Sequence, residues 1–187
     1  MHKIYALFDF ELNLKKGKTL QEFVSLSLKK NASCLQYRDK VNSKDKKIEN
    51  IKKLRELYSG LLIVNDDISL VPFCDGLHLG QEDLLKFGSD ASESVKIVRE
   101  QIGDKILGLS THNLKEIKIA NRLHLDYIGL GAYRDTTTKD ISNILGEKLA
   151  DLAKNSKHKV AAIGGVKYSD KISHVEFLVL GTDIYEN

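Results

Sequence analysis

The chain has 187 residues, of which 42% are hydrophobic and 29% charged, and its formal net charge is +3. This balance is typical of a folded globular protein and excludes an intrinsically disordered chain. The length suits one domain with a sizeable core, so we predict a single domain over residues 1–187. Basic residues are not interleaved with aromatic residues along one face, and no nucleic-acid partner is expected.

Two cysteines, Cys34 and Cys74, lie in or beside apolar runs, and neither has the spacing of a metal ligand. This placement predicts buried thiols in a reducing compartment. No apolar run approaches the roughly 20 residues that a membrane span needs. An acidic residue, Asp9, comes too early for a signal peptide. We therefore expect a cytoplasmic protein with no membrane partner.

Short apolar runs alternate with segments of helical periodicity along the whole chain. Near-continuous apolarity over four or five residues is typical of parallel strands that are buried on both faces. The predicted strands are 4–8, 33–36, 61–64, 76–79, 106–109, 127–130, 160–163 and 177–180. Apolar residues at helical spacing predict helices between most of them. These segments are 20–28, 48–58, 95–102, 114–123 and 145–152.

Alternating strands and helices indicate βαβ units, and eight strands are enough to close a parallel barrel. We predict an α/β protein with a compact (β/α)8 TIM barrel, smaller than the usual size of about 250 residues. The sequence ends shortly after the eighth strand, so we expect a barrel that lacks a full C-terminal helix. An open doubly wound sheet is the alternative, but the glycine-rich fingerprint typical of that fold is absent.

Acidic side chains follow the third and fourth predicted strands. Asp66 and Asp67 follow the third strand, and Glu82 and Asp83 follow the fourth. Such strand ends are where α/β proteins place their chemistry, and two carboxylates there can share a Mg²⁺ ion whose remaining ligands are substrate phosphates. Helix capping is the alternative role, both for one of the two acids after the third strand and for Asp83, because each precedes a helical stretch.

Basic side chains follow the second predicted strand. Strand alternation places Arg38 and Lys40 on one side and Asp39 on the other. A guanidinium can bind pyrophosphate through two hydrogen bonds, and an ammonium adds a point charge. An ordinary charged loop would explain this motif alone. The acids at the adjacent strand ends favour a site for Mg²⁺ and pyrophosphate.

Hydroxyl groups and glycines follow the remaining strands. Ser110 is expected just past the fifth strand. The segment 136–139 (Thr-Thr-Thr-Lys) after the sixth strand is either an anion-binding loop or a solvated surface loop. Gly165 and Gly181 come after the seventh and eighth strands, where barrels commonly bind phosphate through backbone amides. Glycine allows the close approach of backbone that such a site requires.

Six segments together resemble the thiamine phosphate synthase family, in the family's order and across nearly the whole chain. They are QYRDK (36–40), IVNDD (63–67), DGLHLGQEDL (75–84), GLSTH (108–112), DYIGLGAYRDTTTK (126–139) and AIGGV (162–166). The resemblance implies a barrel-shaped transferase of thiamine biosynthesis. It also implies a Mg²⁺-dependent reaction that joins hydroxymethylpyrimidine diphosphate to thiazole phosphate, which yields thiamine phosphate and pyrophosphate.

The resemblance further implies roles for individual residues. Mg²⁺ is matched by Asp66 and Asp83. The groups with a catalytic role are Arg38, Lys40, Ser110 and Lys139. Pyrimidine diphosphate binding is matched by Gln36, Tyr37, Arg38, Asp39, Lys40, Asn65, Ser110 and Lys139. Thiazole phosphate binding is matched by Thr136, Thr137, Thr138, Gly165, Gly181 and Thr182.

The sequence departs from the family pattern on the thiazole side. The usual Gly-Pro before the threonine loop is Gly131-Ala132, the proline just before the threonines is Asp135, and Gly181-Thr182 replaces an apolar-serine pair. Two alternatives therefore stay open. One is a thiazole tautomerase-like isomerase, which needs neither Mg²⁺ nor pyrophosphate, and the other is a catalytically weak barrel that binds a phosphorylated ligand. A homo-oligomer is also expected from the resemblance, because barrels of that family often self-associate.

Overall fold

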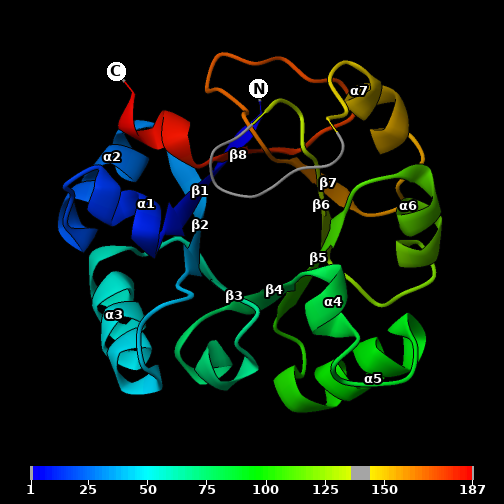
Figure 1. The fold of residues 1–187 in the computed structure, drawn as a ribbon, viewed down its shortest axis with the longest axis horizontal. Helices are drawn as coiled ribbons and strands as arrows, with labels where there is room; N and C mark the ends of the chain where they lie inside the picture. Colours follow the sequence, from blue (N-terminus) through cyan, green and yellow to red (C-terminus); the bar gives the residue numbers. More distant parts are fainter. Residues whose placement is uncertain (1, 136–143, 187) are drawn as a thin grey trace.

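The computed structural model describes residues 2–135 and 144–186, so Thr136, Thr137, Thr138 and Lys139 lie outside the described residues. Eight parallel strands close into a barrel in chain order, with β8 paired to β1 (Figure 1). The strands are β1 (Lys3–Asp9), β2 (Ala32–Arg38), β3 (Leu61–Asn65), β4 (Gly76–Leu79), β5 (Ile106–Thr111), β6 (Tyr127–Leu130), β7 (Lys159–Ala162) and β8 (Phe177–Leu180). The predicted barrel is confirmed.

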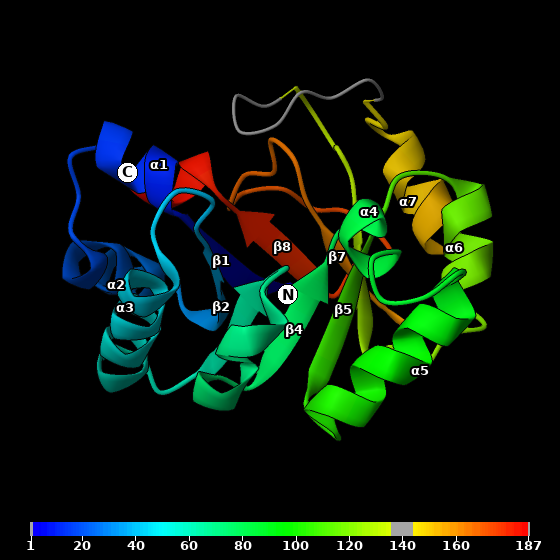
Figure 2. The ribbon, with the colours of Figure 1, turned by 60° about the horizontal axis from the view of Figure 1, so that its bottom comes forward.

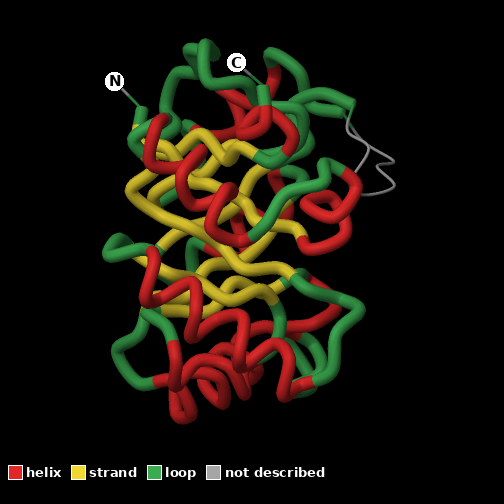
Figure 3. The backbone as a smooth tube through the Cα atoms, turned by 90° about the vertical axis from the view of Figure 1, so that its left-hand side faces the viewer, coloured by secondary structure: helices red, strands yellow, loops and turns green. Residues whose placement is uncertain are grey.

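Helices flank the barrel over much of its circumference, as the side view in Figure 3 also shows. They are α1 (Phe10–Lys15), α2 (Leu20–Lys29), α3 (Lys44–Leu57), α4 (Gln81–Leu84), α5 (Ala91–Ile102), α6 (Leu114–Ala120) and α7 (Lys148–Ala153), with 3₁₀ helices η1 (Ile68–Phe73) and η2 (Thr182–Tyr185). The five helices that periodicity predicts are α2, α3, α5, α6 and α7. Periodicity does not predict α1 and α4, because six and four residues are too few to show an apolar stripe.

No helix connects β7 to β8, and the irregular segment 163–176 takes its place. Val166, Ile172 and Val175 of this segment are buried in the main core cluster, so the segment covers this flank of the barrel without helical structure. Figure 1 shows only loops and η2 between α7 and α2. Tyr185 of η2 packs against Phe23 of α2, with ring centroids 5.9 Å apart. The β8 strand is thus followed by a short 3₁₀ helix that docks on α2.

Two groups of buried side chains make up the core. The larger group lies mainly between the strands and the helices, and the smaller one fills the barrel with residues such as Tyr5, Tyr127 and Val179. Both cysteines are free and buried, as predicted, and burial raises the pKa of Cys34 to about 12. None of the described helices is long and apolar enough to cross a membrane.

Candidate active site at the carboxyl ends of the strands

The predicted basic residues lie at the carboxyl end of β2. This strand runs to Arg38, so Tyr37 and Arg38 belong to the strand and do not follow it as predicted. Arg38 forms an ion pair with Asp9, the last residue of β1, and Lys40 Nζ lies 2.6 Å from Asp66 Oδ2. The two cations therefore contact carboxylates at the ends of the strands on either side of β2.

Tyr37 and Asp39 lie on the other side of the strand, as alternation predicts. The Tyr37 hydroxyl donates to Asp39 Oδ2 at 2.6 Å and accepts from Asn50 of α3 at 3.1 Å. Asp39 also accepts the backbone amides of Val41 and Asn42. Burial alone would raise the pKa of Asp39, but these donors outweigh it and hold the pKa below its ordinary value. Both side chains stabilise the loop between β2 and α3, and their contact with substrate stays a prediction.

The acids after β3 and β4 have three different surroundings. Asp67 is the N-cap of η1 and accepts the Ser69 amide at 3.1 Å, so the capping alternative holds for this residue. Asp83 lies inside α4, whose N-cap is Gly80, so the capping alternative for Asp83 is wrong. Asp66 follows β3 directly with φ of +61°, a conformation that Asp and Asn adopt more readily than most residues.

One oxygen of Asp66 and one of Asp83 face a common space beside Gly80. A Cβ placed on Gly80 would lie 3.2 Å from Asp83 Oδ2 and 3.9 Å from Asp66 Oδ1. The second oxygen of each acid contacts a lysine, Lys40 for Asp66 and Lys86 for Asp83, both at 2.6 Å. A side chain at Gly80 would fill this space, so glycine keeps it open.

This arrangement fits Mg²⁺. Magnesium commonly takes one or two carboxylates and completes its shell with water and substrate phosphates. Within the described ranges no three His, Cys, Asp or Glu side chains converge into a closed metal cage. Two carboxylates beside an open space match the usual coordination of Mg²⁺, in which water and substrate phosphates complete the shell.

Asp66 is held in its charged form by its neighbours. Burial would raise the pKa of this carboxyl, but the hydrogen bonds from Lys40 and from the Gly80 amide, which lies 3.1 Å from Asp66 Oδ1, lower the pKa below its ordinary value. Asn65 Nδ2 also donates to Asp66, at 2.5 Å. The predicted site residues Lys40, Asn65 and Asp66 thus form one cluster.

Ser110 lies within β5 and not past it, because this strand runs two residues further than predicted. Ser110 Oγ lies 3.0 Å from His78 Nε2, and its carbonyl oxygen accepts from Gln81 Nε2 at 2.5 Å. Gln36 Nε2 donates to the Tyr5 hydroxyl inside the barrel. The sequence reasoning missed Asp9, His78 and Gln81, although Asp9 follows an apolar run just as the other acids do.

The loops after β6 and β7 pack tightly on one another. Gly164 and Gly165 have φ of +86° and +63°, and a Cβ on Gly165 would lie 2.7 Å from the Arg134 Cβ atom. Arg134 donates its amide to the Gly164 carbonyl oxygen at 2.8 Å, and its guanidinium contacts both oxygens of Asp170 at 2.6 and 2.9 Å. This contact fixes the start of the loop that leads to Thr136.

Among the described residues, no acceptor takes the backbone amides of Gly165 and Gly181. These amides are at the carboxyl ends of β7 and β8, where the resemblance places a phosphate. Thr182 is the first residue of η2. The predicted threonines and lysine at 136–139 lie outside the described residues.

We expect Asp170→Asn to lower the free energy of unfolding at pH 7 by about 1 kcal/mol, because it removes a bidentate ion pair with a partly exposed arginine. Hydrogen bonds from Arg134 lower the pKa of Asp170, so its stabilising contribution is present above the ordinary carboxyl pKa and is lost as the pH falls through the folded value. Urea unfolding of the unchanged protein and of Asp170→Asn, at pH 7 and at pH 3, measures the difference in their free energies of unfolding.

The difference in the free energy of unfolding between the unchanged protein and Asp170→Asn should therefore shrink at pH 3. An equal difference at both pH values would contradict a stabilising Arg134–Asp170 ion pair. Asp151→Asn is the matched control, since the Asp151–Lys154 pair is on the exposed face of α7. It should leave the unfolding midpoint unchanged.

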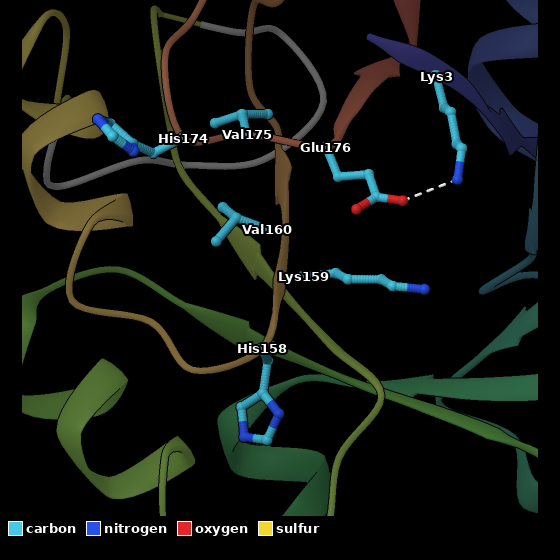
Figure 4. A pocket seen from close by; sticks show the side chains of 7 residues that line it. All are labelled: Lys3, His158, Lys159, Val160, His174, Val175 and Glu176. Atoms are coloured by element: carbon cyan, nitrogen blue, oxygen red, sulfur yellow. Dashed lines mark hydrogen bonds and ion pairs between the residues drawn. The ribbon is translucent and has the colours of Figure 1, made fainter.

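A separate hollow of about 440 Å³ lies at the opposite end of the barrel (Figure 4). It is lined by residues at the amino ends of β1, β7 and β8, including Lys3, Lys159 and Glu176, and Lys3 and Glu176 form an ion pair in its lining. None of the predicted site residues lines it. Figure 2 shows the barrel from a second direction, with the loops after β6 and β7 at the top of the view.

Comparison with known proteins finds a family model and relatives that match most of the chain. The family model described as thiamine monophosphate synthase matches residues 4–176. A thiamine-phosphate synthase of Persephonella marina is 36% identical over 87% of this chain and 76% of its own length. One from Dictyoglomus thermophilum is 31% identical over 99% of this chain and 86% of its own length.

Solved structures show the same fold. A thiamine phosphate pyrophosphorylase from Pyrococcus furiosus aligns with a TM-score of 0.77 and 24% identity, over 98% of this chain and 90% of that one. A mutant tryptophan synthase α-subunit from the same organism aligns with a TM-score of 0.69 at 12% identity, over 99% of this chain and 89% of that one, so the barrel alone does not define the activity. The family model and the identity to the two synthases do define the family, and the chain belongs to the thiamine monophosphate synthase family.

Proposed function

We propose that the chain is a thiamine-phosphate synthase, which couples hydroxymethylpyrimidine diphosphate to thiazole phosphate. The bond between the pyrimidine methylene carbon and the diphosphate oxygen breaks, the thiazole ring nitrogen bonds to that carbon, and pyrophosphate leaves with the electron pair. The observation that supports this most is the pair of oxygens from Asp66 and Asp83 that face one space beside Gly80, with Lys40 in contact with Asp66.

The main task of the protein in this reaction is electrostatic, because a departing pyrophosphate accumulates negative charge. In the structure Arg38 contacts Asp9 and Lys40 contacts Asp66. Both cations are partly exposed, with 25% of the Arg38 side chain and 45% of the Lys40 side chain accessible to solvent. An incoming diphosphate can therefore take hydrogen bonds from both cations without a change in the strands. No protein nucleophile is required, because the attacking atom belongs to the thiazole.

Asp66 and Asp83 are the residues that would hold the magnesium ion. Mg²⁺ bound between them would act as a Lewis acid toward the diphosphate oxygens. Lys40 and Asn65 hold the Asp66 carboxylate in place, and Lys86 does the same for Asp83. The carboxylates are thus oriented before any ligand arrives, which reduces the reorganisation that binding requires.

The thiazole phosphate is assigned to the loops after β7 and β8. Support comes from the amides of Gly165 and Gly181, which have no acceptor in the part of the chain that the structure describes. Glycine at 165 is required by its positive φ and by the Arg134 side chain beside it. Thr136, Thr137, Thr138 and Thr182 complete the proposed contacts to the thiazole phosphate. Lys139 is proposed to bind the diphosphate together with Arg38 and Lys40.

The proposal is tested by incubating purified protein with both heterocyclic phosphates, with and without Mg²⁺. We expect thiamine phosphate and an equal amount of pyrophosphate only when Mg²⁺ is present. Conversion of one thiazole phosphate isomer into another without Mg²⁺ would instead support the tautomerase alternative. Binding of either phosphate without turnover would support the binding barrel. Self-association stays a prediction, which sedimentation velocity tests.

A further inference from the structure

A line of hydrogen bonds crosses the barrel interior from β2 to β5, which we call the interior network. Gln36 Nε2 donates to the Tyr5 hydroxyl at 2.8 Å, and the Tyr5 and Tyr127 hydroxyl oxygens are 2.9 Å apart. The Tyr127 hydroxyl lies 2.9 Å from His78 Nδ1, and His78 Nε2 lies 3.0 Å from Ser110 Oγ. All but Ser110 are buried, so the network ends at the one member that reaches the mouth of the barrel.

Glycines on the neighbouring strands make room for the two rings at the centre of the network. A Cβ on Gly129 would lie 3.1 Å from His78 Cε1, and a Cβ on Gly108 would lie 2.2 Å from Tyr127 Cζ. The rings of His78 and Tyr127 are themselves stacked, with centroids 5.4 Å apart. The strands are therefore shaped to hold the imidazole in one orientation.

The direction of the hydrogen bonds follows from the Gln36 amide. Tyr5 accepts from Gln36 Nε2. In the arrangement that continues this direction, Tyr5 gives its single hydrogen to Tyr127, and Tyr127 gives its own to His78 Nδ1. Burial raises the pKa of both tyrosines well above the ordinary value, so each keeps its hydrogen. His78 Nδ1 is then an acceptor, and the imidazole hydrogen is on Nε2, where it faces Ser110 Oγ.

We propose that the interior network makes the Ser110 hydroxyl a hydrogen-bond donor to the pyrimidine diphosphate, with Gln36, Tyr5, Tyr127 and His78 as positioning residues. Because Ser110 Oγ accepts from His78 Nε2, its own hydrogen is directed elsewhere, and no acceptor for it lies among the described residues. Ser110 then serves as a donor to a nitrogen or oxygen atom of the substrate, and His78 does not act as its base. This inference rests on the proposed function for the identity of the acceptor, but the direction of the network does not.

The opposite direction makes a different prediction. If Gln36 accepted from Tyr5 through its carbonyl oxygen, every hydrogen bond of the network would reverse. His78 would then carry its hydrogen on Nδ1, and Ser110 would donate to Nε2, as in a serine that is activated by a histidine base. The two directions therefore differ in one observable, the tautomer of His78.

The test uses the whole protein, labelled with ¹⁵N at histidine and without substrate, in long-range ¹H–¹⁵N correlation spectra at neutral pH. The chain has six histidines, and the signals that disappear in His78→Gln identify His78. We expect a protonated Nε2 and an unprotonated Nδ1. A protonated Nδ1, in either the other tautomer or the imidazolium, would overturn the proposal.

Tyr127→Phe removes the donor to Nδ1 and should shift His78 to a mixture of tautomers, whereas retention of a pure Nε2–H tautomer would contradict the role of Tyr127. Tyr58→Phe is the matched control, because Tyr58 is also a buried tyrosine, but its hydroxyl donates to the Ala32 carbonyl oxygen outside the network. It should leave the His78 signals unchanged.

Kinetics connect the network to the reaction. Ser110→Ala and Tyr127→Phe should each lower kcat/KM by about tenfold, the order of magnitude of one lost hydrogen bond. Tyr127→Phe should have almost no further effect in the Ser110→Ala background, because both changes remove the same contact. Additive effects would contradict the coupling. The NMR result does not depend on activity, so failure of the proposed function and failure of the network are distinguishable.

Discussion

Asp66→Asn is expected to reduce the rate of thiamine phosphate formation by at least about a hundredfold, the usual cost of removing one group that stabilises developing charge. The side chain keeps its shape, and asparagine tolerates the positive φ of this position, so the fold should survive. The charge that faces the space beside Gly80 is lost. Asp83→Asn should have a similar effect, because its oxygen faces the same space.

The measurement is the rate as a function of Mg²⁺ concentration, together with binding of Mn²⁺ followed by electron paramagnetic resonance. Both variants should bind Mn²⁺ more weakly than the unchanged protein. Asp67→Asn is the control, since Asp67 caps η1 and asparagine is an equally good cap. Its rate should stay within about twofold of the unchanged protein. Full activity and unchanged Mn²⁺ binding in Asp66→Asn would rule out the metal assignment.

Arg38→Ala is expected to affect both substrate binding and stability. It removes the guanidinium proposed to bind the diphosphate, so the KM for hydroxymethylpyrimidine diphosphate should rise by about tenfold or more. It also leaves the carboxylate of Asp9, which is 4% exposed, without its ion-pair partner. Loss of a partner for a buried charge should lower the free energy of unfolding by about 2 kcal/mol.

Two further variants separate these effects. Arg38→Lys keeps the charge but cannot form bidentate hydrogen bonds. Compared with Arg38→Ala, it should therefore restore most of the free energy of unfolding but only part of the affinity for hydroxymethylpyrimidine diphosphate. Arg55→Ala is a matched control, because Arg55 pairs with Asp75 at the amino end of β4, at the other end of the barrel. It should lower stability without a change in KM. An unchanged KM and an unchanged kcat in Arg38→Ala would contradict the proposed role.

Much of the barrel could be predicted from short-range patterns. Parallel strands are buried on both faces and read as continuous apolar runs, and three of them (76–79, 127–130 and 177–180) have the predicted bounds. The ends of β2 and β5 were harder to predict, because Arg38 and Ser110 are polar residues that remain in the strand ladder. Hydrogen bonds to neighbouring strands decide such boundaries, and they depend on residues far away in the sequence.

Individual side chains at the strand ends were only partly predictable. The sequence could place Asp66 and Arg38 at the carboxyl ends of neighbouring strands, but capping explained the acids equally well. Only the structure distinguishes the cap, Asp67, from Asp83, which lies inside a four-residue helix that the periodicity could not predict. The orientation of a short helix is set by its packing, and packing is not visible in local sequence.

The sequence by itself determined the alternation of strands and helices, the barrel, the family and the positions of acids and bases at the strand ends, because each depends on residue type and spacing along the chain. The tertiary structure alone decided which groups meet. It pairs Arg38 with Asp9 from β1 and directs one oxygen each of Asp66 and Asp83 to the space beside Gly80. It also joins Gln36 to Ser110 through three buried rings from β1, β6 and β4. Such contacts arise only when the barrel closes, because closure brings strands from distant parts of the sequence within hydrogen-bond distance across the interior.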